Sequence, residues 1–71
     1  MAVMTLSELR KSCGVTQVDL AAKTGIPQSQ LSRIERSDGV RISTLQRYLA
    51  GLGAKLVVRV KLDGKVREVS L

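Results

Sequence analysis

Residues 16–36, TQVDLAAKTGIPQSQLSRIER, are the stretch of sequence that decides the fold. Thr16, followed three residues later by Asp19, has the spacing of a capping box, so a helix is expected to begin here. The apolar residues after Thr16 recur with a helical period, and the helix is expected to end at Thr24–Gly25 because glycine permits a left-handed turn. The sequence therefore predicts a short helix that stops at a tight turn.

A second short helix follows this turn almost immediately. Pro27 marks its start, and it is predicted over residues 28–36, with Leu31 and Ile34 facing the core. Two helices at this spacing around a glycine turn are typical of a helix-turn-helix, which presents its second helix to the major groove of DNA. The opposite side of this second helix carries Ser29, Ser32, Arg33 and Arg36.

The residue types on this side match the hydrogen-bonding pattern of the major groove. Gln28 begins the helix, where side chains reach deepest into the groove, and glutamine can pair with adenine. Arginine can pair with guanine, and serine with several bases. The alternative is an ordinary solvated face, which every surface helix has. The face carries Arg33 and Arg36 without an acidic residue, and this favours contact with DNA bases or phosphates.

Two more helices are predicted around this unit. The first runs from Thr5 to Ser12, because Glu8 lies three residues after Thr5 and completes a second capping box. The last is expected to be capped by Ser43 and to run to about Ala50, before two glycines that end it. The helical part of the chain is therefore expected to be a small bundle.

After Gly53 the hydrophobic period changes from helical to two, as in a β-strand. Asp63–Gly64 lies between two Val-rich runs and is a strong signal of a hairpin, because a type I′ turn needs positive φ at both central residues. The two-residue loop pairs Leu62 with Lys65, Val60 with Arg67, Arg59 with Glu68, Val58 with Val69 and Leu56 with Leu71. The sequence thus predicts a mainly α fold, with a four-helix domain over residues 1–53 and a β-hairpin over 54–71.

The composition excludes most enzyme chemistry. The chain has 71 residues, one Cys and no His, which excludes an internal disulfide, a Cys/His zinc site and a Ser–His or Cys–His catalytic pair. The carboxylates lack metal-ligand spacing and no glycine-rich phosphate loop occurs, so neither a metal nor another cofactor is expected. The net charge of +6 favours a polyanionic partner, most simply nucleic acid.

The sequence also bears on where the protein works. No apolar run of about 18 residues occurs, and charged residues interrupt the N-terminal segment, so neither a membrane span nor a signal peptide is expected. A reducing, cytoplasmic location is the expectation. Cys13 occupies a mostly apolar position and is expected to be a buried, space-filling thiol. Tyr48 is expected to anchor the core or an interface.

From Leu6 to Leu52 the chain resembles the Xre/Cro family of helix-turn-helix repressors. The matching motifs are GVTQVDLA, TGIPQSQLSRIER and ISTLQRYLAGLG. The resemblance implies a lambda-repressor-like bundle that binds double-stranded DNA as a dimer on a near-palindromic operator. It also implies that Gln17 contacts phosphate, that Arg10 and Glu35 form a structural ion pair, and that the residues at the base edges are Gln28, Ser29, Ser32 and Arg33.

Further phosphate contacts are expected from Arg36 and from the residues around the start of the fourth helix. Arg41, Ser43 and Thr44 can bind a phosphate through side chains and free N–H groups. For Ser43, ordinary helix capping is the alternative.

The C-terminal part of the chain is similar to antitoxins of type II toxin–antitoxin pairs, of the Hig and Hip kinds. In some of these a C-terminal strand pairs across the dimer. Since an isolated hairpin is marginal in water, its apolar strip is expected to form a homodimer interface through Leu56, Val58, Val60, Leu62, Val69 and Leu71. Two functions stay open: a DNA-binding autorepressor, with an antitoxin role as one form of it, and a protein-interaction module whose main task is to neutralise a toxin.

Overall fold

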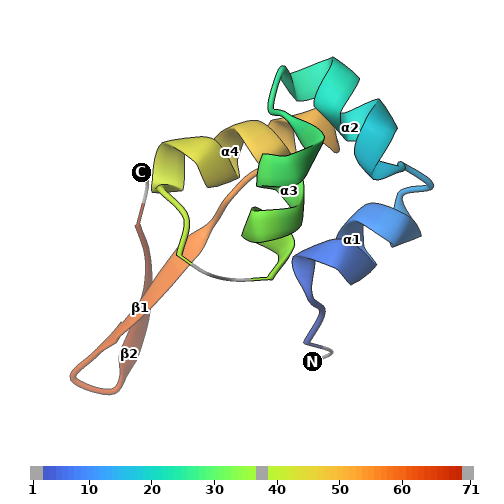
Figure 1. Ribbon diagram of the computed structural model, residues 1–71. Coiled ribbons are helices and arrows are strands. Elements are labelled where there is room, and N and C mark those ends of the chain that lie inside the picture. The colour runs from blue at the N-terminus through green and yellow to red at the C-terminus, as the bar shows by residue number, and fades with distance from the viewer. Residues whose placement is uncertain (1–2, 37–38, 70–71) are drawn as a thin grey trace.

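The computed structural model describes residues 3–36 and 39–69 of the chain. Within these ranges it contains helices α1 (Leu6–Ser12), α2 (Gln17–Thr24), α3 (Gln28–Glu35) and α4 (Ile42–Gly51), followed by strands β1 (Val58–Leu62) and β2 (Lys65–Val69). Figure 1 shows the helices packed as a bundle, with the strands projecting from it as a hairpin. The predicted mainly α fold with a C-terminal hairpin is therefore confirmed.

Both predicted capping boxes are present. The Thr5 hydroxyl accepts a hydrogen bond from the Glu8 backbone N–H at 3.1 Å, and Thr16 accepts one from Asp19 at 3.0 Å. In each box the carboxylate in turn accepts from the backbone N–H of the threonine. Helix α2 ends as expected at Gly25, whose φ of 74° lies in the left-handed region.

The start of α4 differs from the expectation. Its N-cap is Arg41, with an extended backbone and no side-chain cap, and the helix begins at Ile42. Ser43 therefore lies inside the first turn, and its predicted role as the cap is wrong. A serine can cap a helix only from the extended residue just outside it, and here the chain enters the helix two residues earlier. The turn expected at residues 37–39 lies partly outside the described residues.

The core lies between α2, α3 and α4 and consists of aliphatic side chains around one tyrosine. Its buried members are Leu20, Ile26, Leu31, Ile34, Tyr48 and Leu49. Tyr48 is fully buried, so its expected place in the core is confirmed. Cys13, in contrast, is exposed, and its predicted burial is wrong. Helix α1 ends at Ser12, so its apolar face does not continue to Cys13 at the C-cap.

The hairpin has the register predicted from its loop. β1 and β2 pair antiparallel with Val58 opposite Val69, Arg59 opposite Glu68, Val60 opposite Arg67 and Leu62 opposite Lys65. Asp63 and Gly64 both have positive φ, 51° and 75°, as a type I′ turn requires. The expected pairing of Leu56 with Leu71 lies outside the described residues.

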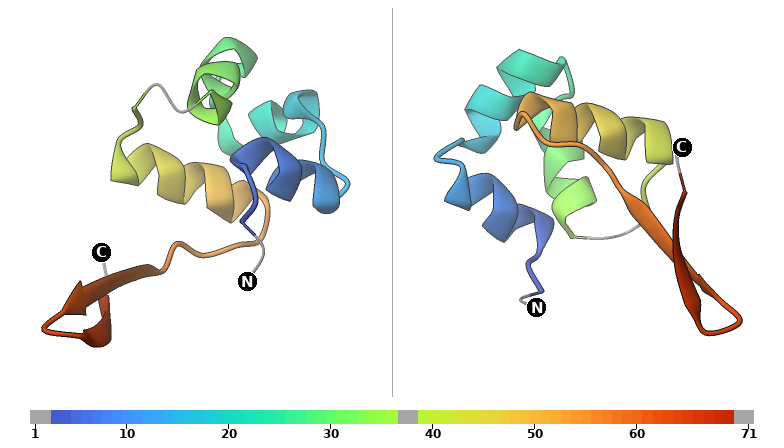
Figure 2. Two further views of the ribbon diagram at one scale, coloured as in Figure 1. Left: turned by 90° about the horizontal axis from the view of Figure 1, so that it is seen from below. Right: turned by 180° about the vertical axis from the view of Figure 1, so that it is seen from behind.

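The hairpin stands away from the helices in both views of Figure 2, so the molecule is elongated, with extents of 42 × 23 × 22 Å. Leu56, just before β1, is the hairpin-side residue that packs against the helical core. Within the described ranges, every helix is too short or too polar to cross a bilayer.

Candidate nucleic-acid interface

Helix α3 presents a polar face because its apolar residues fix its rotation. Leu31 is fully buried and Ile34 is 4% exposed, so both point into the core. Glu35, at the end of the helix, is also turned inward, with only 7% of its side chain exposed. The first turn of α3 carries no acidic residue. Gln28, Ser29 and Arg33 are exposed and Ser32 is half-buried. The four residues expected to contact bases therefore lie on one helix, with some part of each open to solvent.

A surface hollow joins this helix to the start of α4. It has a volume of about 410 Å³ and contains Ser29 and Arg33 from α3 together with Arg41 and Thr44. The structure thus brings two of the expected base-contacting residues beside two of the expected phosphate-contacting residues. Arg36 is exposed at the C-cap of α3, and Ser43 is exposed in the first turn of α4. Neither of these last two lines the hollow.

Gln17, the first residue of α2, joins α3 to the interior of the bundle. Its Nε2 donates to Glu35 Oε1 at 3.2 Å. Its Oε1 accepts a hydrogen bond from Ser32 Oγ at 3.2 Å and a longer one from Gln28 Nε2 at 3.4 Å. The side chain expected to contact phosphate therefore also contacts two of the residues expected to contact bases.

Arg10 and Glu35 form a bidentate ion pair between α1 and α3. Arg10 Nε donates to Glu35 Oε2 at 2.8 Å, and Nη2 donates to Oε1 at 3.2 Å. The two side chains are only 8% and 7% exposed. The third arm of the guanidinium, Nη1, donates to the Val15 carbonyl at 2.9 Å. The pair thus holds the start of the bundle to the end of α3.

Tyr48 adds a contact that the sequence did not indicate. Its hydroxyl donates to Glu35 Oε2 at 2.7 Å and so ties α4 to the ion pair. Burial, together with this bond to Glu35, raises the pKa of Tyr48, so its hydroxyl stays protonated and acts as a donor. No spacing rule links residues on separate helices, and the tyrosine's burial was the only signal available.

The hydrogen bonds also determine the charge state of Glu35. Burial by itself would raise the pKa of this carboxyl, but the hydrogen bonds from Arg10, Tyr48 and Gln17 more than offset it, so the pKa lies below its ordinary value. Glu35 is therefore a carboxylate at neutral pH. An ionised carboxylate only accepts hydrogen bonds, and each of its oxygens here accepts two.

The hairpin carries an apolar strip on one face. Val58 is half-buried, while Val60, Leu62 and Val69 are 43%, 63% and 41% exposed. The register places these four side chains on the same face, together with the cross-strand cations Lys65 and Arg67. Leu71, also expected in this strip, lies outside the described residues.

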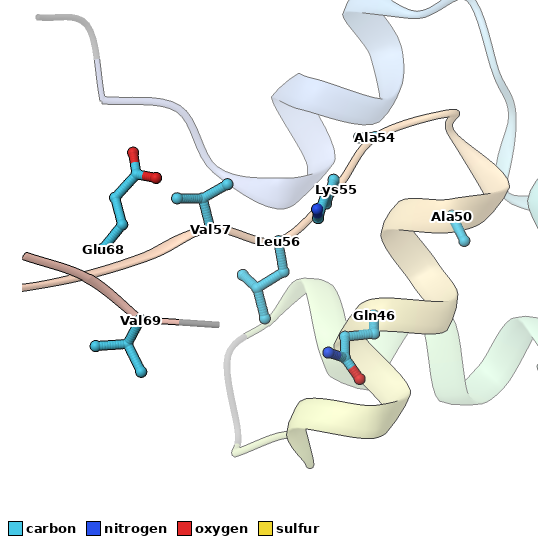
Figure 3. Close-up of a pocket in the computed structure, with 8 residues that line it drawn as sticks. All are labelled: Gln46, Ala50, Ala54, Lys55, Leu56, Val57, Glu68 and Val69. Atoms are coloured by element: carbon cyan, nitrogen blue, oxygen red, sulfur yellow. The ribbon is translucent and has the colours of Figure 1, made fainter. Parts of the chain in front are cut away.

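A second hollow, of about 470 Å³, lies where this strip meets α4. Gln46 and Ala50 of α4 line it together with the hairpin segment. In Figure 3 Leu56 and Val69 point to one side of this segment, and Val57 and Glu68 point to the other. Leu56 thus packs on its own core. The strip therefore begins in the chain's own core and continues outward along an exposed face.

The comparisons with known proteins agree with this arrangement. The helix-turn-helix family matches over residues 6–58, and the chain belongs to this family. Among curated relatives, putative antitoxin HigA2 of Mycobacterium tuberculosis is 41% identical over 59 residues, covering 80% of this chain and 58% of the relative. Putative antitoxin HigA3 of the same organism is 41% identical over 54 residues, covering 72% and 50%. The chain thus spans about half the length of these relatives.

Two solved structures are similar over the whole chain. One, described as induced DNA bending by unique dimerization of HigA antitoxin, has a TM-score of 0.81 and 33% identity, and each chain is covered completely. The other, DNA-bound antitoxin HigA3, has a TM-score of 0.83 and 31% identity, with 100% of this chain and 95% of that chain covered. The fold, including the hairpin, is therefore shared with HigA antitoxins.

Proposed function

We propose that this protein is a sequence-specific double-stranded DNA-binding transcriptional regulator that binds a palindromic operator as a homodimer. The observation that carries the proposal is the acid-free outer face of α3, with Arg33 beside Arg41 across the hollow of about 410 Å³. Side chains that match base edges thus lie next to side chains that can hold the DNA backbone. The likeness to a DNA-bound HigA3 structure supports this role.

Each set of residues has a distinct task in this proposal. The base edges are contacted by Gln28, Ser29, Ser32 and Arg33, and the phosphates by Gln17, Arg36, Arg41, Ser43 and Thr44. Gln17 keeps its second amide N–H for a phosphate after donating the first to Glu35. The described residues contain no group of three or more His, Cys, Asp or Glu side chains placed to hold a metal ion.

The hairpin supplies the dimer interface in this proposal, so residues 1–53 bind DNA and 54–71 dimerise. A two-stranded hairpin is marginal by itself, and this one exposes Val60, Leu62 and Val69. A second copy presents the same strip by two-fold symmetry, and pairing the two would cover it. Two α3 helices set about 34 Å apart, one turn of DNA, would then meet the two halves of a palindrome. The dimerization described for a HigA antitoxin of similar fold supports this arrangement.

A second candidate function is neutralisation of a toxin protein. It is favoured by the antitoxin names of the relatives and by the hollow of about 470 Å³ between α4 and the hairpin, which contains apolar residues such as Leu56 and Val69. In this case the protein is the antitoxin of a toxin–antitoxin pair and represses its own operon. Without DNA binding, the chain would be a protein-interaction module that keeps a helix-turn-helix fold.

One experiment separates these functions. The DNA upstream of the protein's own reading frame is used in a gel-shift assay with an excess of random-sequence competitor. The neighbouring small protein is co-expressed and tested for co-purification. A shifted band that survives the competitor supports the regulator. Co-purification without sequence-selective binding would replace it by the interaction module.

A further inference from the structure

The hydrogen bonds around Gln17 have a fixed direction, and this direction restricts what Ser32 can contact in DNA. Gln17 lies between the Glu35 carboxylate on one side and Ser32 and Gln28 on the other. Its amide has one end that only donates and one end that only accepts. Which end faces which neighbour therefore sets the direction of every hydrogen bond in the cluster.

Glu35 decides the orientation of the Gln17 amide. The carboxylate offers no proton, so the group that approaches Glu35 Oε1 at 3.2 Å has to be the Gln17 NH₂. The reverse orientation would put an amide oxygen against a carboxylate oxygen, which is repulsive. Arg10 and Tyr48 hold the carboxylate in place, with Arg10 Nε and Tyr48 Oη at 2.8 and 2.7 Å from its Oε2. The Gln17 oxygen consequently faces α3.

Ser32 then has no proton left for DNA. Its hydroxyl carries a single hydrogen, and that hydrogen is donated to Gln17 Oε1 at 3.2 Å. The oxygen of Ser32 keeps only acceptor positions, and the residue is half-buried, so it is not closed off from solvent. Gln28 is not restricted in this way, because after donating one N–H to Gln17 it keeps a second N–H and its own oxygen.

We propose that Ser32 selects a base that presents an exocyclic amino group, adenine N6 or cytosine N4, and discriminates against the keto oxygens of thymine and guanine. This inference rests on the proposed DNA-binding function. In the major groove adenine and cytosine present donors where thymine and guanine present acceptors. An acceptor-only hydroxyl is matched to the first pair and repelled by the second. Gln17 is thus a positioning residue that sets the hydrogen-bond polarity of α3.

The test combines the substitution Ser32→Ala, which removes the hydroxyl, with the removal of single functional groups from the DNA bases. Binding sites are first selected from random double-stranded DNA with the wild-type protein. In the selected site, each amino group is then removed by placing purine for adenine or 2-pyrimidinone for cytosine. Each keto group is removed by placing 2-aminopurine for guanine or 5-methyl-2-pyrimidinone for thymine. Dissociation constants are measured for wild-type protein and Ser32→Ala on every duplex.

Ser32→Ala is expected to weaken binding about threefold to tenfold, the effect of one hydrogen bond. The loss should disappear on one duplex only, in which an amino group is missing, because the two deletions then remove the same bond. Ser29→Ala is the matched control, since Ser29 lies on the same helix and no hydrogen bond joins it to Gln17 among the described residues. The affinity loss caused by Ser29→Ala should disappear when a group is removed from a different base.

Gln17→Met tests the origin of the polarity. Without the acceptor at Gln17, Ser32 can turn its proton toward the groove, so the preference for an amino over a keto partner at its base should fall to about twofold or less. Coupling of Ser32→Ala to a keto deletion, or to no amino deletion, would overturn the inference, as would an unchanged preference in Gln17→Met. If the wild-type protein selected no site at all, the proposed function itself would fail.

Discussion

At the residue scale, the Glu35 carboxylate holds together side chains from three other helices. A buried ion pair is not stabilising by itself, because both charges lose their hydration. Here Arg10, Gln17 and Tyr48 replace the lost water with hydrogen bonds of 2.7–3.2 Å. In the part of the chain that the structure describes, no buried side-chain nitrogen or oxygen lacks a hydrogen-bond partner. Removing the Tyr48 or the Gln17 donor therefore leaves one oxygen of the buried carboxylate with a single hydrogen bond in place of two.

Tyr48→Phe isolates one of these donors. The substitution keeps the aromatic ring in the core and deletes only the hydroxyl that donates to Glu35 at 2.7 Å. The free energy of unfolding is expected to fall by about 1.5–3 kcal/mol, the usual value for a hydrogen bond to a charged group. Chemical denaturation measures it. DNA sequence preference should stay the same, because Tyr48 contacts Oε2 of Glu35 and Gln17 contacts Oε1. An undiminished stability would show that the bond contributes nothing.

The lowered pKa of Glu35 makes stability depend on acid. Its carboxylate is stabilised in the folded state, so that contribution is fully present above the ordinary pKa of 4.5 and is lost as the pH falls through the lower, folded value. The hydrogen bonds with Thr16 lower the pKa of Asp19 and add in the same direction. With no histidine in the chain, stability should be nearly constant from about pH 6 to 8 and decline below about pH 4.5. Denaturation curves at a series of pH values test this, and a decline that began near pH 6.5 would contradict it.

Substituting Arg33 or Arg41 by alanine removes one positive charge in each case, but the two substitutions should affect DNA binding differently. Arg33→Ala is expected to weaken binding to the best operator by about 1–3 kcal/mol and to relax the preference at one base pair. Arg41→Ala should weaken binding to all sequences alike and reduce the slope of log affinity against log salt by about one. Binding measured on specific and random duplexes at several salt concentrations distinguishes them. If Arg33→Ala kept both affinity and preference, the contact face of α3 would be misplaced.

At the element scale, a glycine allows α4 to approach α2 closely. A Cβ added at Gly51 would lie 2.5 Å from Thr24 Cγ2 and 2.6 Å from Leu20 Cδ1. Neither side chain can easily move. Leu20 is fully buried, and the Thr24 hydroxyl donates to the Leu20 carbonyl at 2.7 Å and accepts from the Ile26 N–H at 3.2 Å. The position of α4, and of the hairpin that follows it, thus depends on the absence of a side chain at Gly51.

Gly51→Ala is therefore expected to destabilise the protein, even though alanine is the better helix former. Overpacking should lower the free energy of unfolding by about 1–3 kcal/mol. Gln46→Ala, at an exposed position of the same helix, is the matched control and should change stability by less than about 0.5 kcal/mol. Thermal and chemical denaturation of the two variants decide the point. If the two variants were equally stable, α2 and α4 would be able to move apart at Gly51 without lowering the free energy of unfolding.

At the scale of the whole molecule, the proposed dimer connects the hairpin to DNA binding. Ending the chain after residue 57 removes both strands but keeps Leu56, which packs on the core of its own chain. This shortened protein should stay folded, sediment as a monomer at micromolar concentration and bind a half-site weakly, without cooperativity on a palindrome. Val60→Asp in the full chain should act in the same direction, because it places charges on the exposed strip. A shortened protein that dimerised as tightly as the full chain would place the interface on the helices.

The starts of α1 and α2, the hairpin register and the polar face of α3 could be predicted from the sequence alone, because they depend on local chemistry. The capping boxes of α1 and α2 each involve residues three positions apart, and the Asp63–Gly64 loop sets the hairpin register without reference to the rest of the chain. The polar face of α3 followed from its helical period, and the residues expected to contact DNA there came from that period and from the family resemblance. The capping boxes, the hairpin register and the polar face of α3 depend on backbone geometry within a few residues.

Tertiary packing decided the features that depend on residues far apart in the chain. Tyr48 reaches Glu35 across 13 residues and Gln17 reaches it across 18, so neither contact follows from local spacing. The entry of the chain into α4 at Ile42 and the exposure of Cys13 likewise depend on where the helices end and pack. The sequence determined that α3 would present serines, glutamine and arginines. The direction of their hydrogen bonds was decided by the bundle, because only the folded chain brings the Glu35 carboxylate against Gln17.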